Sequence, residues 1–228
     1  PLRIGLVQFA APMPGLPLGV HSILVAGVRT GGDTTTATIP FNFDWHRALS
    51  IFLTLKLQHA DVTGRAAGDS AESRADFAFS IIRLLGQDSL AAKHVDEPCF
   101  PDAPGSFASG QICQVQLDST LLGGSFRQSD GGFHPDSALS VAELARRIEA
   151  VTGTTPAGTP TSQDYVRGLI DAGFMPPSVD STALLQSPDQ PATHYLATAI
   201  FYQTWVLAPA GGGQTLAQRY IDPSWIRW

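Results

Sequence analysis

Glycine and proline interrupt this chain at short intervals along its whole length. Its 228 residues include 22 glycines and 17 prolines, about one residue in six, against roughly one in eight in average usage. Glycine weakens a helix and an internal proline breaks it. We therefore expect neither a helical bundle nor a coiled coil as the main architecture.

Two β-prone runs near the N-terminus predict a hairpin. Residues 21–28 and 35–43 flank Thr30-Gly31-Gly32-Asp33, and paired glycines supply the positive φ that hairpin turns need. Two later segments also predict strands. Residues 112–117 alternate apolar and polar side chains, as a half-exposed strand does. Residues 195–207 are mostly apolar or threonine on both faces, which suits a central strand covered on both sides.

Four segments carry helix start signals followed by apolar residues at helical spacing. We expect these helices to begin at Asp44, Asp69, Ser140 and Thr161. The second and third have a glutamate three residues on, at Glu72 and Glu143, which is the capping-box pattern. Glycines stand where these two helices would end, at Gly86 and Gly153. The fourth helix should end near Gly173.

These elements together predict the α+β class. We expect one domain over residues 1–228, built from one largely antiparallel sheet with three or four helices packed on it and long Gly/Pro-rich loops. The helices beginning at Asp44 and Asp69 should cover one face of that sheet. The segment 87–136 is expected to be irregular apart from the strand at 112–117, and we detect no internal repeat.

Charged side chains are scarce. They make up 15 % of the residues, and the net charge is −6 at pH 7, so we expect no direct nucleic-acid partner bound through a basic face. No apolar run approaches the ~20 residues of a membrane span, so none is expected. Low charge fits a subunit covered by neighbours in an assembly, because interface cores are depleted of charge. A coding bias towards Ala, Gly, Pro and Arg explains it equally well.

The two cysteines, Cys99 and Cys113, are expected to be reduced. A pair of cysteines in a chain of this length is no disulfide framework, although the thirteen residues between them could form a disulfide loop. The N-terminal sequence lacks the shape of a signal peptide. We therefore expect cytoplasmic synthesis, with incorporation into a virion as a further possibility.

The opening LRIGLVQFAAP resembles the first strand of the carbon–nitrogen hydrolase (nitrilase-like) family. That family needs a glutamate, a lysine and a nucleophilic cysteine in separate strand-end motifs. The chain offers Glu72 inside a predicted helix, Lys56 and Lys93 in unsuitable surroundings, and Cys113 in the middle of a predicted strand. The set is incomplete, so we do not assign the chain to this family.

Three histidines share the pattern His-x-Asp. Imidazole and carboxylate groups two residues apart can bind one metal ion, and a carboxylate can also orient a ligating imidazole. The candidate metal ligands are His59, Asp61, His94 and Asp96, and the candidate catalytic pair is His134 and Asp136. Ordinary loop composition explains the pattern as well. No nucleophile elbow and no phosphate-binding loop occurs, and we expect no cofactor.

The C-terminal tail is rich in aromatic residues, which either pack on their own domain or anchor in a neighbouring subunit. The candidate interface residues are Tyr220, Trp225, Ile226 and Trp228, since Trp and Tyr dominate interface hot spots. The tail and the low charge favour a non-catalytic structural subunit of a homo-oligomeric assembly, such as a bacteriophage head, neck or tail. The alternatives are a small-molecule enzyme, such as a metal-assisted hydrolase using a His-x-Asp pair, and a ligand- or protein-binding accessory domain.

Overall fold

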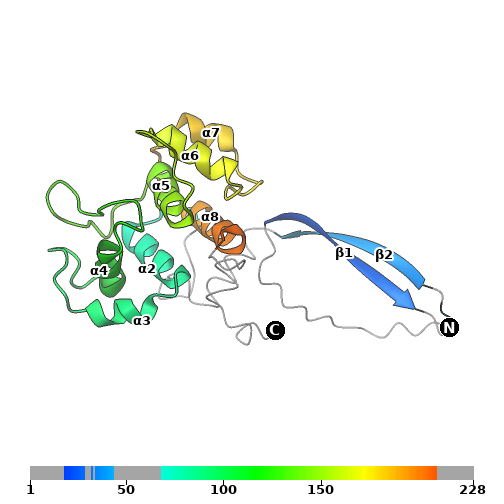
Figure 1. The fold of residues 1–228 in the computed structure, drawn as a ribbon, viewed down its shortest axis with the longest axis horizontal. Helices are drawn as coiled ribbons and strands as arrows, with labels where there is room; N and C mark the ends of the chain where they lie inside the picture. The colour runs from blue at the N-terminus through cyan, green and yellow to red at the C-terminus, as the bar shows by residue number, and fades with distance from the viewer. Residues whose placement is uncertain (1–17, 29–31, 33, 44–67, 210–228) are drawn as a thin grey trace.

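The computed structural model describes residues 18–28, 32, 34–43 and 68–209. These form a helical body from which a β-hairpin projects (Figure 1). The elements in chain order are β1 (Gly19–Val28), β2 (Thr34–Phe43), α2 (Arg74–Leu84), α3 (Asp88–Ala91), the 3-10 turn η1 (Ala92–His94), α4 (Ser109–Leu117), α5 (Val141–Thr152), α6 (Ser162–Asp171), α7 (Ser181–Gln186) and α8 (His194–Leu207). The helix expected from Asp44 lies outside the described residues.

The predicted hairpin is confirmed. β1 and β2 pair antiparallel in a continuous register from Gly19 opposite Phe43 to Val28 opposite Thr34. The base of the hairpin rests on α8. There the buried Phe43 ring lies 5.4 Å from the ring of Tyr202, and the backbone N–H of Leu18 donates to Oε1 of Gln203 at 2.8 Å.

The fold class is α+β, as predicted, with more helices than expected. The described residues contain seven α-helices of four to fourteen residues, and most of the glycines and prolines among the described residues fall in the connections between them. These helices pack on one another, and they leave the outer part of the hairpin uncovered: residues 34–40 of β2 are all exposed. Gly/Pro content has therefore limited helix length without limiting helix number.

The strand expected at residues 195–207 is wrong, because this segment is the helix α8. Eleven of the fourteen residues of α8 are buried, so the apolar pattern runs around the whole helix and has no helical period. A short run that is apolar on every side fits a buried strand and a buried helix equally well. The buried hydroxyls of two threonines in α8 are satisfied within the helix. Thr198 donates to the carbonyl of His194 and Thr204 to the carbonyl of Ile200, four residues before each.

The strand expected at residues 112–117 is also wrong, since these residues belong to α4. Ile112, Cys113, Gln114 and Val115 are consecutive and all buried, which an alternating strand in a half-exposed position would not allow. The segment 87–136, expected to be irregular, therefore contains α3, η1 and α4.

Most of the predicted helix ends are confirmed. Ser140 caps α5, with its hydroxyl accepting from the N–H of Glu143, and the left-handed Gly153 ends that helix. Thr161 caps α6, and Gly86 follows α2 with a φ of 68°. Asp69 does not cap α2, however. Ser73 does, and its hydroxyl accepts from the N–H of Asp76 at 3.0 Å.

The helical body contains an internal threefold repeat that we did not detect in the sequence. Immediately before α2, α5 and α8, three residues form a closed ring of backbone hydrogen bonds. Glu72 donates to Ala192 at 2.7 Å, Ala192 to Leu139 at 2.8 Å, and Leu139 to Glu72 at 2.8 Å. Each residue of the ring thus donates to one neighbour and accepts from the other.

Two further sets of backbone hydrogen bonds join the same three segments cyclically, with donors and acceptors running in the opposite direction. In one set the pairs are Arg74 to Ser137, Val141 to Gln190, and His194 to Ser70. In the other the pairs are Ala75 to Pro135, Ala142 to Pro188, and Tyr195 to Gly68. Residues 68–76, 135–143 and 188–196 are therefore structurally equivalent, and we call them together the central junction. In this order they begin the first, second and third repeats, which lead into α2, α5 and α8.

The sequence carries a faint signature of this repeat. Asp-Ser-Ala occurs at 69–71 and at 136–138, Asp-Gln-Pro occurs at 189–191, and a Ser or Thr cap follows two residues later each time. Asp136, a candidate catalytic residue from the sequence, is one of these repeated aspartates. The pattern is too short to be recognised without the structure.

Candidate functional site

Each contact between neighbouring repeats uses different chemistry at equivalent positions of the central junction. Between the third and first repeats, an ionisable cluster forms. Glu72 is 0 % exposed, and its Oε2 lies 2.5 Å from Nδ1 of His194. Nε2 of the same imidazole lies 3.6 Å from the Asp76 carboxylate. At the positions equivalent to Glu72, the other two repeats have Leu139 and Ala192.

Burial and the contact between Glu72 and His194 together set the protonation of these two groups. Burial raises the pKa of Glu72 to about 7, against the opposing effect of His194. Burial alone would lower the pKa of His194, but the hydrogen bond and the charge of Glu72 outweigh it and raise that pKa. Both groups therefore hold protons to a higher pH than they would in water.

Between the first and second repeats, the equivalent contact is an ion pair. Nη1 of Arg74 lies 2.9 Å from both carboxylate oxygens of Glu143. Arg74 also donates to the carbonyls of Phe126 and Phe133, at 2.8 and 2.7 Å. The guanidinium thus fixes the loop that precedes α5 to the start of α2.

Arg147 binds an earlier part of the same loop, at residues 122–125. Its guanidinium is almost completely buried and donates to the carbonyls of Leu122, Gly124 and Ser125 at 2.8, 2.6 and 3.1 Å. Burial lowers the pKa of Arg147 to about 10, which still leaves it charged at neutral pH. Both of its Nη atoms donate within the protein, so its role is structural.

Two pockets lie at equivalent places in the second and third repeats. The pocket beside the start of α5, which we call the α5 pocket, has a volume of about 490 Å³ and is lined by polar groups that include Arg127, Glu143, Arg146, Tyr165 and Asp189. Its counterpart beside α8 has a volume of about 380 Å³ and is lined mainly by apolar groups that include Val179, Leu184, Pro191, Leu196 and Ala199. Where one pocket has Glu143 and Arg146, the other has Leu196 and Ala199.

The candidate catalytic residues His134 and Asp136 line one pocket, of about 810 Å³, together with Asp102 and Phe107. The two candidates are not paired with each other. Nε2 of His134 lies 2.7 Å from the Asp130 carboxylate. His134 has a φ of 59°, a strained value for a residue other than glycine.

Asp102 supports the strained backbone at His134. Its carboxylate accepts from the backbone N–H groups of Phe133 and His134, at 2.8 and 2.7 Å. Burial opposes the ionised form, but these hydrogen bonds prevail and lower the pKa of Asp102. Asp102 is therefore a fixed anion that shapes the loop, with its oxygens already occupied.

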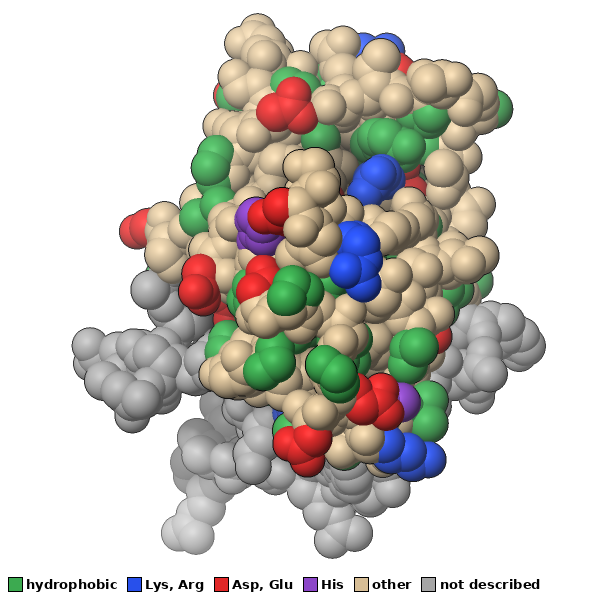
Figure 2. All heavy atoms as spheres, turned by 90° about the vertical axis from the view of Figure 1, so that its left-hand side faces the viewer, with side chains coloured by type: hydrophobic (Ala, Val, Ile, Leu, Met, Phe, Trp, Pro, Cys, Tyr) green, Lys and Arg blue, Asp and Glu red, His purple; other side chains and the backbone are tan. Residues whose placement is uncertain are grey.

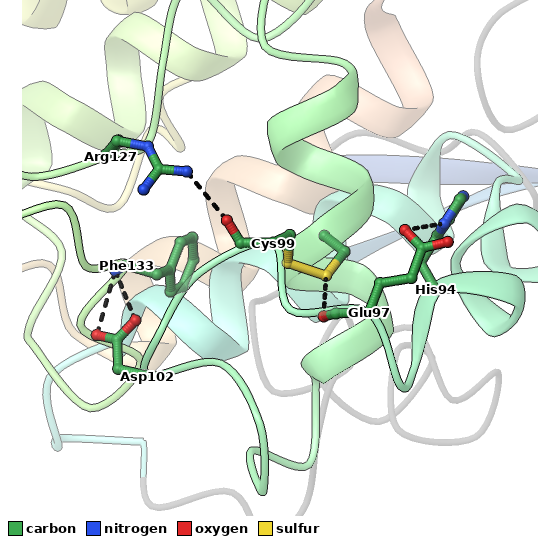
Figure 3. Close-up of a disulfide and its surroundings, with 7 residues drawn as sticks. His94, Glu97, Cys99, Asp102, Arg127 and Phe133 are labelled. Carbon is green, nitrogen blue, oxygen red and sulfur yellow. Dashed lines mark hydrogen bonds and ion pairs between the residues drawn. A yellow bond between two sulfur atoms is a disulfide. The ribbon is translucent and has the colours of Figure 1, made fainter.

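A disulfide joins Cys99 to Cys113, which corrects the expectation of two reduced thiols. The helix α4 turns the buried Cys113 towards the preceding loop, and the two Cα atoms lie 5.5 Å apart, within the usual range for a disulfide. The carbonyl of Cys99 also accepts from Arg127 at 3.0 Å. Figure 3 shows the disulfide between the Arg127 and Asp102 contacts on one side and the His94–Glu97 pair on the other.

The structure pairs His94 with Glu97 rather than with Asp96, since Nδ1 of His94 lies 2.8 Å from the Glu97 carboxylate. Across the described part of the chain, no three His, Cys, Asp or Glu side chains are grouped so that they could hold a metal ion. His59, Asp61 and the four tail residues Tyr220, Trp225, Ile226 and Trp228 lie outside the described residues.

The body has exposed apolar side chains at its α3–α4 end, namely Leu90, Val95, Phe107, Leu117 and Leu121. Figure 2 views that end and shows apolar side chains interspersed with acidic, basic and histidine side chains. None of the helices described is long and apolar enough to cross a membrane.

No known protein family matches this chain, and no curated protein is significantly similar to it in sequence. Sequence reasoning missed the Glu72–His194–Asp76 cluster and the α5 pocket. The sequence marks Glu72 only as a capping residue and does not single out His194, because the two meet only through the cyclic arrangement of the repeats. The recurring Asp before each capped helix is the trace of that arrangement in the sequence, and it is too short to reveal the arrangement by itself.

Proposed function

We propose that this chain is a non-catalytic structural subunit of a homo-oligomeric assembly. The supporting observation is the projecting hairpin. Val20 and Leu24 are 80 % and 68 % exposed on one of its faces, and Ile39 is 52 % exposed on the other. A hairpin of two strands is at best marginally stable in water unless something packs on it, so this one needs a partner.

The composition of the hairpin indicates what that partner is. Neither strand contains an Asp, Glu, Lys or Arg, although charged residues are the usual protection of exposed strands against pairing with other chains. An uncharged, threonine-rich surface has no complementarity to a charged partner. It matches a second copy of itself, which offers the same apolar side chains and the same backbone groups.

The helical body supports a structural role. Its arginines Arg74 and Arg147 are engaged with carbonyls and Glu143, and a disulfide fixes α4. Disulfides persist on virion and cell surfaces and in other oxidising environments. Bacteriophage heads, necks and tails are assemblies of the kind we propose, and assignment to one of them stays a prediction. So does the enzyme alternative, for which His134 in its open pocket is the candidate base.

The test is the association state of hairpin variants of the full chain. Leu24→Asp places a charge on the exposed face, and Ser22→Asp places the same charge two residues away on that face, where no large apolar side chain is lost. We expect Leu24→Asp to lower the sedimentation coefficient of the assembly at an unchanged circular dichroism spectrum, and Ser22→Asp to lower it much less. Unchanged sedimentation for Leu24→Asp would contradict the proposal.

A second candidate function is binding of a small anionic ligand in the α5 pocket. The observation that favours it is Arg146, whose Nε is buried there without a hydrogen-bond partner. The equivalent pocket beside α8 has Ala199 at this position, so the charge is not required by the repeat. Calorimetric titration of the full chain with inorganic phosphate and with malonate tests this candidate. Binding should be lost in Arg146→Ala and kept in Arg167→Ala, which removes an arginine from outside the pocket. Equal binding by both variants would count against it.

A further inference from the structure

The Glu72–His194–Asp76 cluster occupies a place where the fold does not require charge. At the equivalent contact between the second and third repeats, Val141 takes the place of His194, and Ala192 and Leu196 take the places of Glu72 and Asp76. Val141 and Ala192 are fully buried. A repeat contact can thus be made with apolar side chains alone. The contact between the third and first repeats instead buries a carboxyl group, whose Oε1 has no hydrogen-bond donor.

The cluster holds one end of α8. His194 is the first residue of that helix, and its backbone N–H is held by Ser70 while its imidazole contacts Glu72 and Asp76. Further along, α8 carries Tyr202 and Gln203, on which the base of the hairpin rests. The attachment of α8 to α2 therefore also supports the hairpin.

We propose that the Glu72–His194–Asp76 cluster is a proton-dependent latch that holds the N-terminal end of α8 on α2 and loosens as the pH rises. With protons present, the buried Glu72 is neutral or faces a charged imidazole, and the imidazolium also faces Asp76. When those protons are lost, a buried carboxylate faces a neutral imidazole with Asp76 nearby. That arrangement leaves a buried negative charge without compensation.

The direction of the pH effect follows from the number of protons bound in two states. In the closed joint the start of α8 is held on α2, and in the open joint this contact is broken. Glu72 titrates near 4.5 when exposed and at about 7 when buried, so the closed joint binds more protons than the open one between these values, and its stability falls as pH rises. The pKa of His194 is raised in the closed joint, so its contribution is present below its ordinary pKa and is also lost on raising the pH. Among the described residues, the ionisable groups that act on His194 are Glu72 and Asp76, and those that act on Glu72 are His194 and Asp76.

Hydrogen exchange of the full chain, followed by mass spectrometry, tests the latch. The readout is the protection of α8 divided by that of α5, the equivalent helix whose first residue is Val141. All proteins in this comparison carry Glu149→Gln, because the buried Glu149 of α5 would otherwise add a pH dependence of its own to the ratio. The ratio cancels the intrinsic pH dependence of exchange. From the raised pKa of Glu72 alone, we expect the ratio of α8 to α5 protection to fall about tenfold between pH 6 and pH 9. A ratio that stays constant over this range would overturn the proposal.

Variants separate the latch from a general loss of stability. Glu72→Gln keeps the shape of the side chain and removes its titration, so the ratio should lose most of its pH dependence. His194→Gln should remove part of the pH dependence of the ratio. This variant provides the test if Glu72→Gln does not fold. Glu143→Gln alters the ion pair of the neighbouring joint and should leave the pH dependence unchanged. Undiminished pH dependence in Glu72→Gln and His194→Gln would contradict the latch. This readout does not depend on assembly, so the latch and the proposed function can fail separately.

Discussion

Replacement of Glu149 by glutamine should make the stability of the protein fall less as the pH rises from 5 to 7. Glu149 lies on α5 and is 0 % exposed, and neither of its carboxylate oxygens has a hydrogen-bond partner. The carboxyl group packs directly against Gly168 on α6, where an added Cβ would clash with its Oε1. Burial therefore raises its pKa from 4.5 to about 8.

The magnitude follows from this shift. In the unfolded chain Glu149 ionises near pH 4.5, whereas in the folded protein it keeps its proton to about pH 8. The folded state binds more protons between these values, so the free energy of unfolding falls as pH rises. The loss due to this residue is about 1 kcal/mol at pH 5 and about 3 kcal/mol at pH 7.

The assay is urea unfolding of the wild type and of Glu149→Gln at pH 5, 6, 7 and 8. The amide is also unpaired, so a constant offset between the two proteins carries no information. The difference in unfolding free energy should grow in favour of the variant by about 2 kcal/mol from pH 5 to pH 7. Glu97→Gln, at an exposed position, should show no such growth. Parallel curves for the wild type and Glu149→Gln would refute the reasoning.

Three further predictions concern stability and association. Replacing both Cys99 and Cys113 by serine should lower the free energy of unfolding by roughly 3 kcal/mol, measured in urea, and thiol titration of the denatured wild type without reductant should find no free thiol. Arg147→Met should cost more than about 3 kcal/mol, because three carbonyls and Glu143 lose a charged donor, whereas Arg167→Met at an exposed position should cost little in the same assay. Deletion of residues 224–228 should lower the sedimentation coefficient at an unchanged melting temperature if the tail anchors in a neighbour, and a lowered melting temperature at unchanged sedimentation would place the tail on its own domain.

The parts of the fold that could be predicted are those decided by neighbours in sequence. The hairpin follows from two β-prone runs around a glycine pair, and Ser140, Gly153 and Thr161 mark helix ends by local hydrogen bonds. The nature of α8 could not be predicted in the same way. Its burial on nearly every side removes the helical period, and only the packing of the other repeats around it distinguishes helix from strand.

The candidate site depended still more on distant contacts. Glu72 and His194 are 122 residues apart in the sequence and meet through a ring of backbone hydrogen bonds that no local pattern encodes. Cys99 and Cys113 are close in sequence, but their pairing required α4 to be a helix, and the alternating residues 112–117 favoured a strand. His134 and Asp136 did reach one pocket together, yet the partner of the imidazole there is Asp130.

The association state of the intact chain tests the account most directly. Light scattering on the purified full chain, over a range of concentrations and without reductant, gives the mass of the particle in solution. The account predicts a species several times the 24.2 kDa of one chain, either of one defined size or a growing series. A single species of 24.2 kDa at every concentration would contradict it.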